Sequence, residues 1–236
     1  MKPISAMVAF AATIAFALPA SAQVTGGQIA LSHSGFFDDT SVNKTALDGA
    51  LEFGINRNFS VQGDLGFASF NATSTDVTTA TVHGIFHQSP STSIGAFYGV
   101  DRSSGSSVDL LGLEFGTQAA STGIEGYAAH AKDGGISGHI LGLSGRQEIS
   151  NGMGFSASVD HTKIENALKI TRFGLGADYT VAQHTRLSAE IGSADASLGG
   201  FGGSETYFKL GAKVSFGAKR GATFGKRSLT SVIPGL

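Results

Sequence analysis

The segment His87-Gln88-Ser89 carries the residue types that could perform nucleophilic chemistry. A histidine can act as the general base toward a serine hydroxyl when the two side chains lie within hydrogen-bond reach. Ser89, however, precedes Pro90 in a Gln-Ser-Pro-Ser run, and that composition is typical of a turn. We therefore interpret Ser89 as a turn residue, and we expect no catalytic residue in this chain.

Metal binding is the second chemistry to consider. His83 and His87 are four positions apart, which is a ligand spacing on a helix. On a strand they would share a face but stand about 13 Å apart, too far to hold one ion. Asp38-Asp39 and Asp195 could bind calcium weakly in loops, but the ligand run of an EF-hand is missing. We expect neither a metal site nor a cofactor.

Charged residues instead recur on one face of alternating segments. In Ala46–Asn56, the apolar Leu47 and Leu51 alternate with Asp48 and Glu52. A period of two places the two sets on opposite faces of a strand. A lysine or arginine facing lipid near the midplane costs about 2–4 kcal/mol, so the charged face should line an interior. The residues that we predict to line this interior as a pore are Asp48, Glu52, Asp64, Asp101, Glu114, Asp160, Arg172, Asp178, Arg186, Glu190, Lys209 and Lys213.

The signs of these charges are not evenly distributed along the chain. Acids dominate the early segments, and bases appear late, from Arg172 to Lys213. In a closed barrel the first and last strands are neighbours, so acids and bases would meet across the lumen. This arrangement fits a transverse field in a narrow water-filled pore and fits a salt-bridged plug equally well.

Alternating segments recur from Gly26 to Phe216 and predict an all-β fold. The expected architecture is a closed antiparallel transmembrane β-barrel of about 12 strands with short periplasmic turns, because bacterial barrels have even strand numbers. Most segments reach the roughly 9–11 residues that a tilted strand needs to cross a bilayer. Alternation is least clear in 77–87 and 123–148. The predicted strands are Gly27–Gly35, Ala46–Asn56, Phe59–Phe70, Val77–His87, Ser93–Asp101, Val108–Gly116, Gly123–Lys132, Ser137–Glu148, Gly154–Thr162, Lys169–Tyr179, Thr185–Ala194 and Thr206–Phe216.

The connections and the aromatic residues give two further expectations. Outer connections such as Phe36–Thr45, Arg102–Ser107, Lys163–Leu168 and Asp195–Glu205 are predicted to be longer on average than the periplasmic turns. Aromatic residues near strand ends predict interfacial girdles, although strand propensity alone also favours phenylalanine and tyrosine. The predicted girdle residues are Phe36, Phe37, Phe53, Phe59, Phe70, Phe86, Tyr98, Phe115, Tyr127, Phe155, Phe173, Tyr179, Tyr207 and Phe216.

The start of the chain has the organisation of a secretory signal. Lys2 precedes the apolar run Met7–Leu18, and Ala20-Ser21-Ala22 is a small-residue cleavage site. We therefore expect residues 1–22 to be removed, residues 23–216 to form the barrel, and residues 217–236 to form a periplasmic or lumen-facing tail. The chain has no cysteine, which excludes disulfide staples. Its formal charge of −2 gives no support for nucleic-acid binding.

The segment from Lys209 to Phe216 resembles the closing-strand signal that the outer-membrane barrel-assembly machinery recognises, with Lys209, Gly211, Val214 and Phe216 at the matching positions. The run 221–236 is similar to the C-terminal ends of porin-like proteins. The chain thus resembles the small porin-like outer-membrane β-barrel family of alphaproteobacteria. Porins usually end on the last strand, whereas this chain continues for twenty residues beyond Phe216. We expect this tail to fold back into the lumen mouth or to form a disordered basic segment.

This resemblance, together with the charged interior, implies a porin-like channel for passive diffusion of small hydrophilic solutes or ions in the cell outer membrane of a Gram-negative bacterium. The implied partners are outer-membrane lipid and the barrel-assembly machinery, with no nucleic acid, and analogy with larger porins adds a homo-oligomer. One alternative is a non-conducting structural or adhesion barrel. Another is a lipid-acting barrel enzyme, since the order of His87 and Ser89 resembles that in the outer-membrane phospholipase barrel. A soluble β-sandwich is disfavoured because only 14% of the residues are charged.

Overall fold

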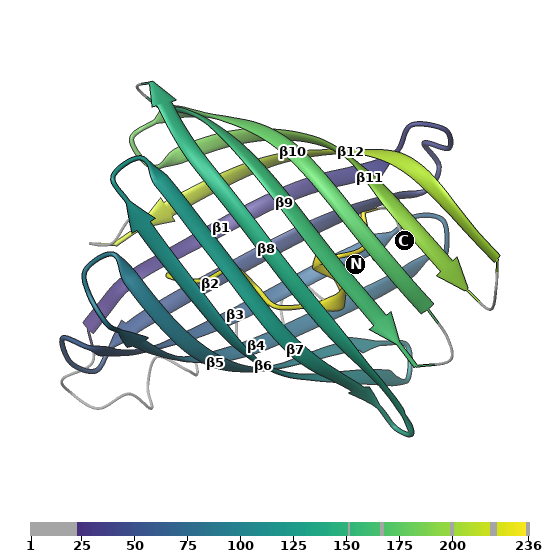
Figure 1. The fold of residues 1–236 in the computed structure, drawn as a ribbon, viewed down its shortest axis with the longest axis horizontal. Coiled ribbons are helices and arrows are strands. Elements are labelled where there is room, and N and C mark those ends of the chain that lie inside the picture. The colour runs from purple at the N-terminus through teal and green to yellow at the C-terminus, as the bar shows by residue number, and fades with distance from the viewer. Residues whose placement is uncertain (1–22, 151, 166–167, 199–200, 218–220, 235–236) are drawn as a thin grey trace.

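Twelve antiparallel strands form a closed barrel in the computed structural model of this chain (Figure 1). The structure describes residues 23–150, 152–165, 168–198, 201–217 and 221–234. The predicted signal peptide, residues 1–22, lies outside this range. The strands are β1 (Gln23–Phe36), β2 (Asn43–Gly54), β3 (Phe59–Phe70), β4 (Thr75–His87), β5 (Thr92–Ser103), β6 (Ser106–Ala119), β7 (Thr122–Asp133), β8 (Ile136–Ser150), β9 (Met153–Ile164), β10 (Leu168–Ala182), β11 (Thr185–Leu198) and β12 (Phe201–Phe216).

Closure is achieved between the first and last strands. β1 pairs with β12 from Gly27 opposite Phe216 to Phe36 opposite Tyr207. Every other strand pairs with its two neighbours in sequence. The ladder has no free edge, which satisfies the backbone hydrogen bonds that a bilayer would leave unpaired. The predicted fold class and strand number are confirmed.

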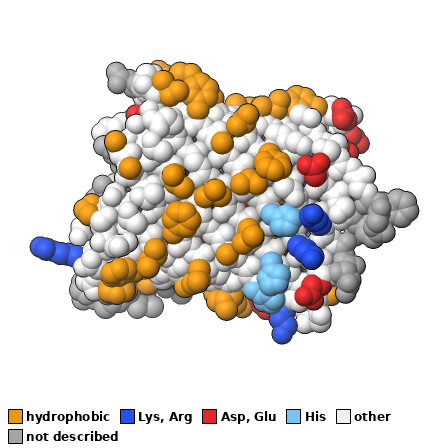
Figure 2. Space-filling view, viewed as in Figure 1, with side chains coloured by type: hydrophobic (Ala, Val, Ile, Leu, Met, Phe, Trp, Pro, Cys, Tyr) orange, Lys and Arg blue, Asp and Glu red, His pale blue; other side chains and the backbone are white. Residues whose placement is uncertain are grey.

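The outer surface of the barrel is apolar. Outward-facing Leu111, Leu113 and Leu175 are 63%, 68% and 67% exposed, far more than a soluble protein tolerates as a continuous patch. Figure 2 shows such hydrophobic side chains spread across one face of the barrel. Among the described residues, no helix is long and apolar enough to cross a membrane. Exposed apolar side chains of the strands form a lipid-facing surface, and most charged side chains of the strands point inward.

We call the end at which β1 begins and β12 finishes the terminal end, and the opposite end the far end. Connections have two to four residues at the terminal end and two to six at the far end. The far-end connections are slightly longer on average, but they are shorter than the ranges predicted for the outer connections, because the strands extend beyond their predicted ends. Between β5 and β6, for example, only Ser104 and Gly105 remain, with φ of 24° and 95°. Positive φ at both central residues is typical of a tight hairpin turn that continues the strand twist.

Several predicted girdle aromatics face the lumen instead of the membrane interface. Phe36 and Tyr207 pack together inside the barrel, and Phe70 packs with Ala46 and Ala68. Tyr127 also lies in an interior cluster. The girdle prediction is wrong for these residues. Others keep an outward, exposed position: Phe37, Phe59, Tyr98, Phe115, Phe155, Phe173, Tyr179 and Phe216.

The same interior clusters explain why alternation is unclear in β4, β7 and β8. Ile85 and Ile140 are only 2% exposed and point into the lumen. His130 and His139 are exposed on the outer face. A simple rule of apolar outside and polar inside fails here, because part of the lumen is filled with apolar side chains.

Candidate functional site

The C-terminal segment 221–234, which we call the tail, occupies the lumen (Figure 1, yellow coil inside the barrel). It begins at the terminal end, where Gly221 lies against Gly26 near the start of β1. A Cβ atom on Gly26 would stand 1.9 Å from the Gly221 carbonyl oxygen, so only glycine permits this approach. At its other extreme, the Pro234 carbonyl accepts a hydrogen bond from Ser34, near the far end of β1. The tail therefore crosses the lumen from one end to the other.

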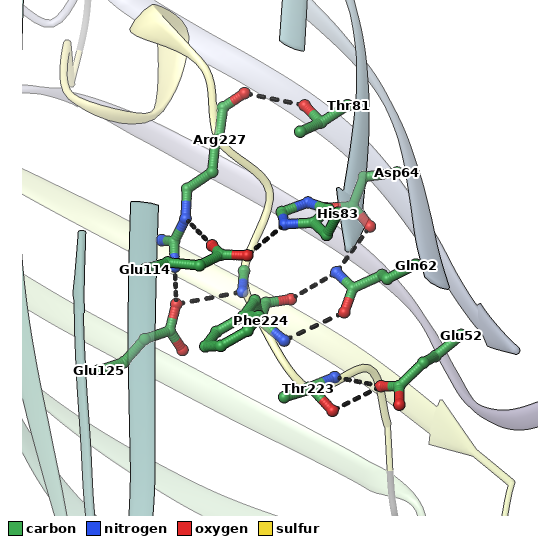
Figure 3. A network of polar contacts seen from close by, with 11 residues as sticks. Glu52, Gln62, Asp64, Thr81, His83, Glu114, Glu125, Thr223, Phe224 and Arg227 are labelled. Carbon is green, nitrogen blue, oxygen red and sulfur yellow. Dashed lines mark hydrogen bonds and ion pairs between the residues drawn. The ribbon is translucent and has the colours of Figure 1, made fainter. Parts of the chain in front are cut away.

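Near the terminal end, polar side chains of the barrel bind the tail backbone (Figure 3). A carboxylate oxygen of Glu52 accepts hydrogen bonds from the backbone N–H of Thr223 at 2.9 Å and from its hydroxyl at 2.6 Å. The Gln62 amide donates to the Phe224 carbonyl at 2.8 Å and accepts from the Phe224 N–H at 3.1 Å. Glu52 and Gln62 are fully buried. The barrel thus supplies partners that a strand neighbour would otherwise provide.

Arg227 is the main ionic anchor of the tail. Its Nε donates to Glu114 at 2.8 Å, and its Nη2 donates to Glu125 at 2.5 Å. The guanidinium also lies 4.3 Å from the centre of the Tyr127 ring, within the range of a cation–π contact. Thr81 donates to the Arg227 carbonyl at 3.0 Å. With only 8% of its side chain exposed, this arginine depends on both carboxylates.

His83 links the two acids on either side of it. Its Nδ1 lies 2.6 Å from Glu114 Oε1, and its Nε2 lies 3.0 Å from Asp64 Oδ2. Ionised carboxylates only accept hydrogen bonds, so both contacts are satisfied together when both ring nitrogens carry protons. The imidazole also lies nearly parallel to the Phe224 ring, with centroids 6.4 Å apart. His83 therefore joins the acidic wall to the tail.

The far half of the tail is held by Asp101 and Lys44. Asp101 accepts from the Ser228 hydroxyl and from the Leu229 N–H at 2.8 Å. Ser228 also caps a short 3-10 turn over Leu229–Ser231. Lys44 donates to the carbonyls of Thr230 and Ile233. Val232 fills an apolar pocket of the wall formed by Phe97, Leu110, Ala129, Ala131 and Ile140.

The wall formed by β8–β12 has a different character. Arg146 binds Asp178 through two hydrogen bonds of 2.7 and 2.8 Å, and Arg186 lies 3.2 Å from the same carboxylate. Arg172 binds Asp160 at 2.5 Å. Hydrogen bonds between the tail and the described residues go only to β1–β7. Inward-facing residues of this second wall remain partly exposed, including Ser144, Arg146, Arg186, Ser188, Glu190 and Lys213.

The twelve residues predicted to line a pore thus fall on two walls. Asp48, Glu52, Asp101 and Glu114 contact the tail directly, and Asp64 contacts it through Gln62 and His83. In this structure these five face the tail. The other seven belong to the β8–β12 wall: Asp160, Arg172, Asp178, Arg186, Glu190, Lys209 and Lys213.

The sequence predicted that acids of the early strands would meet bases of the late strands across the lumen, and the observed ion pairs differ from this. Asp48 and Glu114 pair with Lys226 and Arg227 of the tail. Of the late bases, Arg172 pairs with Asp160 and Glu190, and Arg186 pairs with Asp178, all on their own wall. Sequence reasoning missed these two tail residues, and also His83, Gln62, Glu125 and Arg146. The adjacent cations Lys226-Arg227, in a chain with many inward acids, were a usable signal.

His87 lies between serines of the two neighbouring strands. Its ring nitrogens lie 2.8 Å from the hydroxyls of Ser60 and Ser93. Ser89 instead accepts from the backbone N–H groups of Ser91 and Thr92, as a turn residue does. No group of three His, Asp or Glu side chains in the described part of the chain could hold a metal ion.

The sequence matches no protein-family model and no curated protein. Several solved structures share its fold. The KdgM porin is 11% identical with a TM-score of 0.61, covering 80% of this chain and 99% of its own. A KdgM porin in complex with disordered oligogalacturonate is 12% identical with a TM-score of 0.63, and the match covers 80% of this chain and 99% of that porin. The COG4313 outer membrane channel from Pseudomonas putida F1 is 14% identical with a TM-score of 0.59, and the match covers 85% of this chain and 97% of that channel. The NanC porin is 10% identical with a TM-score of 0.60, and the match covers 79% of this chain and 98% of that porin. At such identities the likeness establishes the fold, which is that of small outer-membrane porin barrels.

Proposed function

We propose that this protein is a channel for passive diffusion of small hydrophilic solutes and ions, and that the path follows the β8–β12 wall. One observation carries this proposal. The tail binds the β1–β7 wall and leaves partly exposed charged and hydroxyl side chains on the opposite wall. Rings or rows of charged side chains in a wet lumen set which ions enter and how they leave. The shared fold with porins supports the same function.

The composition of this wall gives an expected selectivity. Its basic and acidic residues are nearly balanced, and most are paired with one another. Small Ser144 and Ser188 lie between them. We expect weak ion selectivity rather than a specific binding site. The charged residues are Arg146, Glu148, Asp160, Arg172, Asp178, Arg186, Glu190, Lys209 and Lys213.

Location and assembly complete the proposal. We place the barrel in the outer membrane of a Gram-negative bacterium, after cleavage of residues 1–22, with the terminal end in the periplasm. Assembly would use the signal at Lys209, Gly211, Val214 and Phe216. Outer-membrane lipid and the barrel-assembly machinery are the proposed partners, with a homo-oligomer as a further state to test. The oligogalacturonate bound by KdgM adds acidic oligosaccharides to the solutes that should be tested.

A non-conducting barrel is the second candidate, and the tail itself favours it. The tail spans the lumen, and inward side chains near the far end, such as Phe36 and Tyr207, are nearly fully buried. A side-chain-filled interior of this kind is usual in small barrels. Under this alternative the tail is a permanent plug.

Conductance of the purified, refolded full chain in a planar bilayer separates the two candidates. Discrete current steps with weak ion selectivity support the channel. A bilayer that stays silent after verified insertion supports the plugged barrel and refutes the proposed path. Hydrolysis of lipid by the same sample would contradict both.

A further inference from the structure

Basic side chains gather at one place on the outside of the barrel. His130, His139, Lys163 and Lys169, which we call the basic row, belong to β7, β8, β9 and β10 in that order. They are direct cross-strand neighbours: His130 faces His139, His139 faces Lys163, and Lys163 faces Lys169. All four are exposed. In Figure 2, blue and pale-blue side chains gather beside the hydrophobic surface, with red acidic side chains next to them.

The clustering is specific to this part of the surface. Three of the seven histidines of the chain lie here, since His161 flanks the row on β9. Lys132 lies two residues after His130 on the same face of β7, and it is the third outward lysine. In the described strands the remaining lysines, Lys44, Lys209 and Lys213, belong to the lumen face. Outward lysines therefore occur only at this patch within the described strands.

The basic row lacks protein counter-ions. Like charges directly opposite each other on neighbouring strands destabilise a sheet, and Lys163 and Lys169 stand in that relation. None of the four residues forms an ion pair with the described residues. The nearby acids are engaged elsewhere or lie beside the row: Asp109 accepts from Tyr98, Glu165 accepts from Ser137, and Asp133 ends β7. A row of basic side chains without ion-pair partners fits an external anion.

The position of the basic row relative to the apolar band of the barrel indicates the kind of anion. Along the outer face of β10, Leu175 and Phe173 are exposed apolar residues, followed by Thr171 and then Lys169. Each step of two residues advances about 6.6 Å along the strand. The lysine therefore stands just beyond the apolar band, where lipid headgroups lie. Lysine side chains at that depth extend toward the charged interface.

We propose that the basic row binds the phosphate groups of outer-leaflet glycolipids. This inference rests on the proposed outer-membrane location with the far end at the cell surface. The ligand is a phosphate carried by a membrane lipid, not free phosphate in solution. Adjacent lysines and histidines across four strands match the two phosphates of one headgroup better than a single point charge would.

The test uses the refolded full chain in detergent and native mass spectrometry. The probes are a lipid A with two phosphates and the same lipid after removal of both phosphates. We expect the phosphorylated lipid to bind and the dephosphorylated lipid to bind at least 10-fold more weakly. The double variant Lys163→Gln/Lys169→Gln should weaken binding of the phosphorylated lipid about 30-fold, because each lysine near an anionic lipid surface contributes about a factor of five. Arg57→Gln, which removes an exposed charge at the terminal end, should bind like the wild type.

Three results would overturn the proposal: equal binding of both lipids, wild-type binding by the double variant, or full displacement by millimolar inorganic phosphate. Conductance of the same samples keeps this test apart from the channel proposal. The lysines lie on the outer face, so the double variant should conduct as the wild type does. Conduction without lipid discrimination would reject the basic row alone, and lipid discrimination without conduction would reject the channel alone.

Discussion

Arg227→Ala tests whether the tail is held in the lumen by its ionic anchor. The substitution leaves the fully buried Glu114 and the 30% exposed Glu125 without their shared arginine. Removing one partner of a buried ion pair costs about 3–5 kcal/mol. His83 still donates to Glu114, and Glu125 can take up water, so the lower limit of about 3 kcal/mol applies. The undocked population of the tail should rise about 150-fold.

Trypsin cleavage after Lys226 measures this population, since the protease cannot enter the lumen and cuts only a tail that has left it. Because the wild type is also cut after Arg227, the fragments that begin at residues 227 and 228 are followed together by mass spectrometry. When docking is fast relative to cleavage, the rate follows the undocked fraction. Arg102→Ala, an exposed arginine on β5, is the matched control and should leave the rate unchanged. A wild-type cleavage rate in Arg227→Ala would refute the proposed anchoring.

Three further substitutions test other parts of the interior. Gly26→Val should displace the tail, because its side chain overlaps the tail backbone, and should raise the same cleavage rate; Gly63→Val, where nothing lies within 4 Å, is the control, and equal rates in the two would contradict the close approach. Arg186→Glu/Lys213→Glu should make the wall acidic and move the reversal potential in a potassium chloride gradient toward cation preference; an unmoved potential would place the ion path elsewhere. Ser89→Ala should change neither conductance nor stability beyond about 0.5 kcal/mol, and loss of a lipid-hydrolysing activity in this variant would contradict its assignment as a turn residue.

Much of the barrel follows from local pattern. Asp48 and Glu52 alternate with Leu47 and Leu51. A charged side chain that faces lipid costs free energy, so a membrane-spanning strand must place its charged residues on the inward face. Strand ends were harder to predict than strands. The turn at Ser104-Gly105 is tighter than expected because both residues accept positive φ.

The interior could be predicted only in part. Inward positions of charged residues follow from the period of two, but their partners come from a segment more than a hundred residues away, as with Glu114 and Arg227. Nothing in the strand pattern fixes where a non-repeating tail lies. Phe97 and Ile140 violate the expected polar lumen because Val232 packs on them. Apolar side chains at inward positions indicate that something packs against them in the lumen. The strand pattern alone does not show that this segment is the tail.

Cysteine accessibility tests the division of the lumen most directly, because the chain has no native cysteine. Ser188→Cys places a thiol on the exposed β8–β12 wall, and Thr81→Cys places one beneath the tail, where Thr81 bonds the Arg227 carbonyl. In the full chain a charged methanethiosulfonate reagent should modify Ser188→Cys and reduce the single-channel current. It should leave Thr81→Cys unmodified, except in the Arg227→Ala background, where the rate should rise by the same factor of about 150 as the undocked population. Equal reactivity of the two thiols in the full chain, or no reaction at Ser188→Cys, would contradict a tail that covers one wall and leaves the other to water.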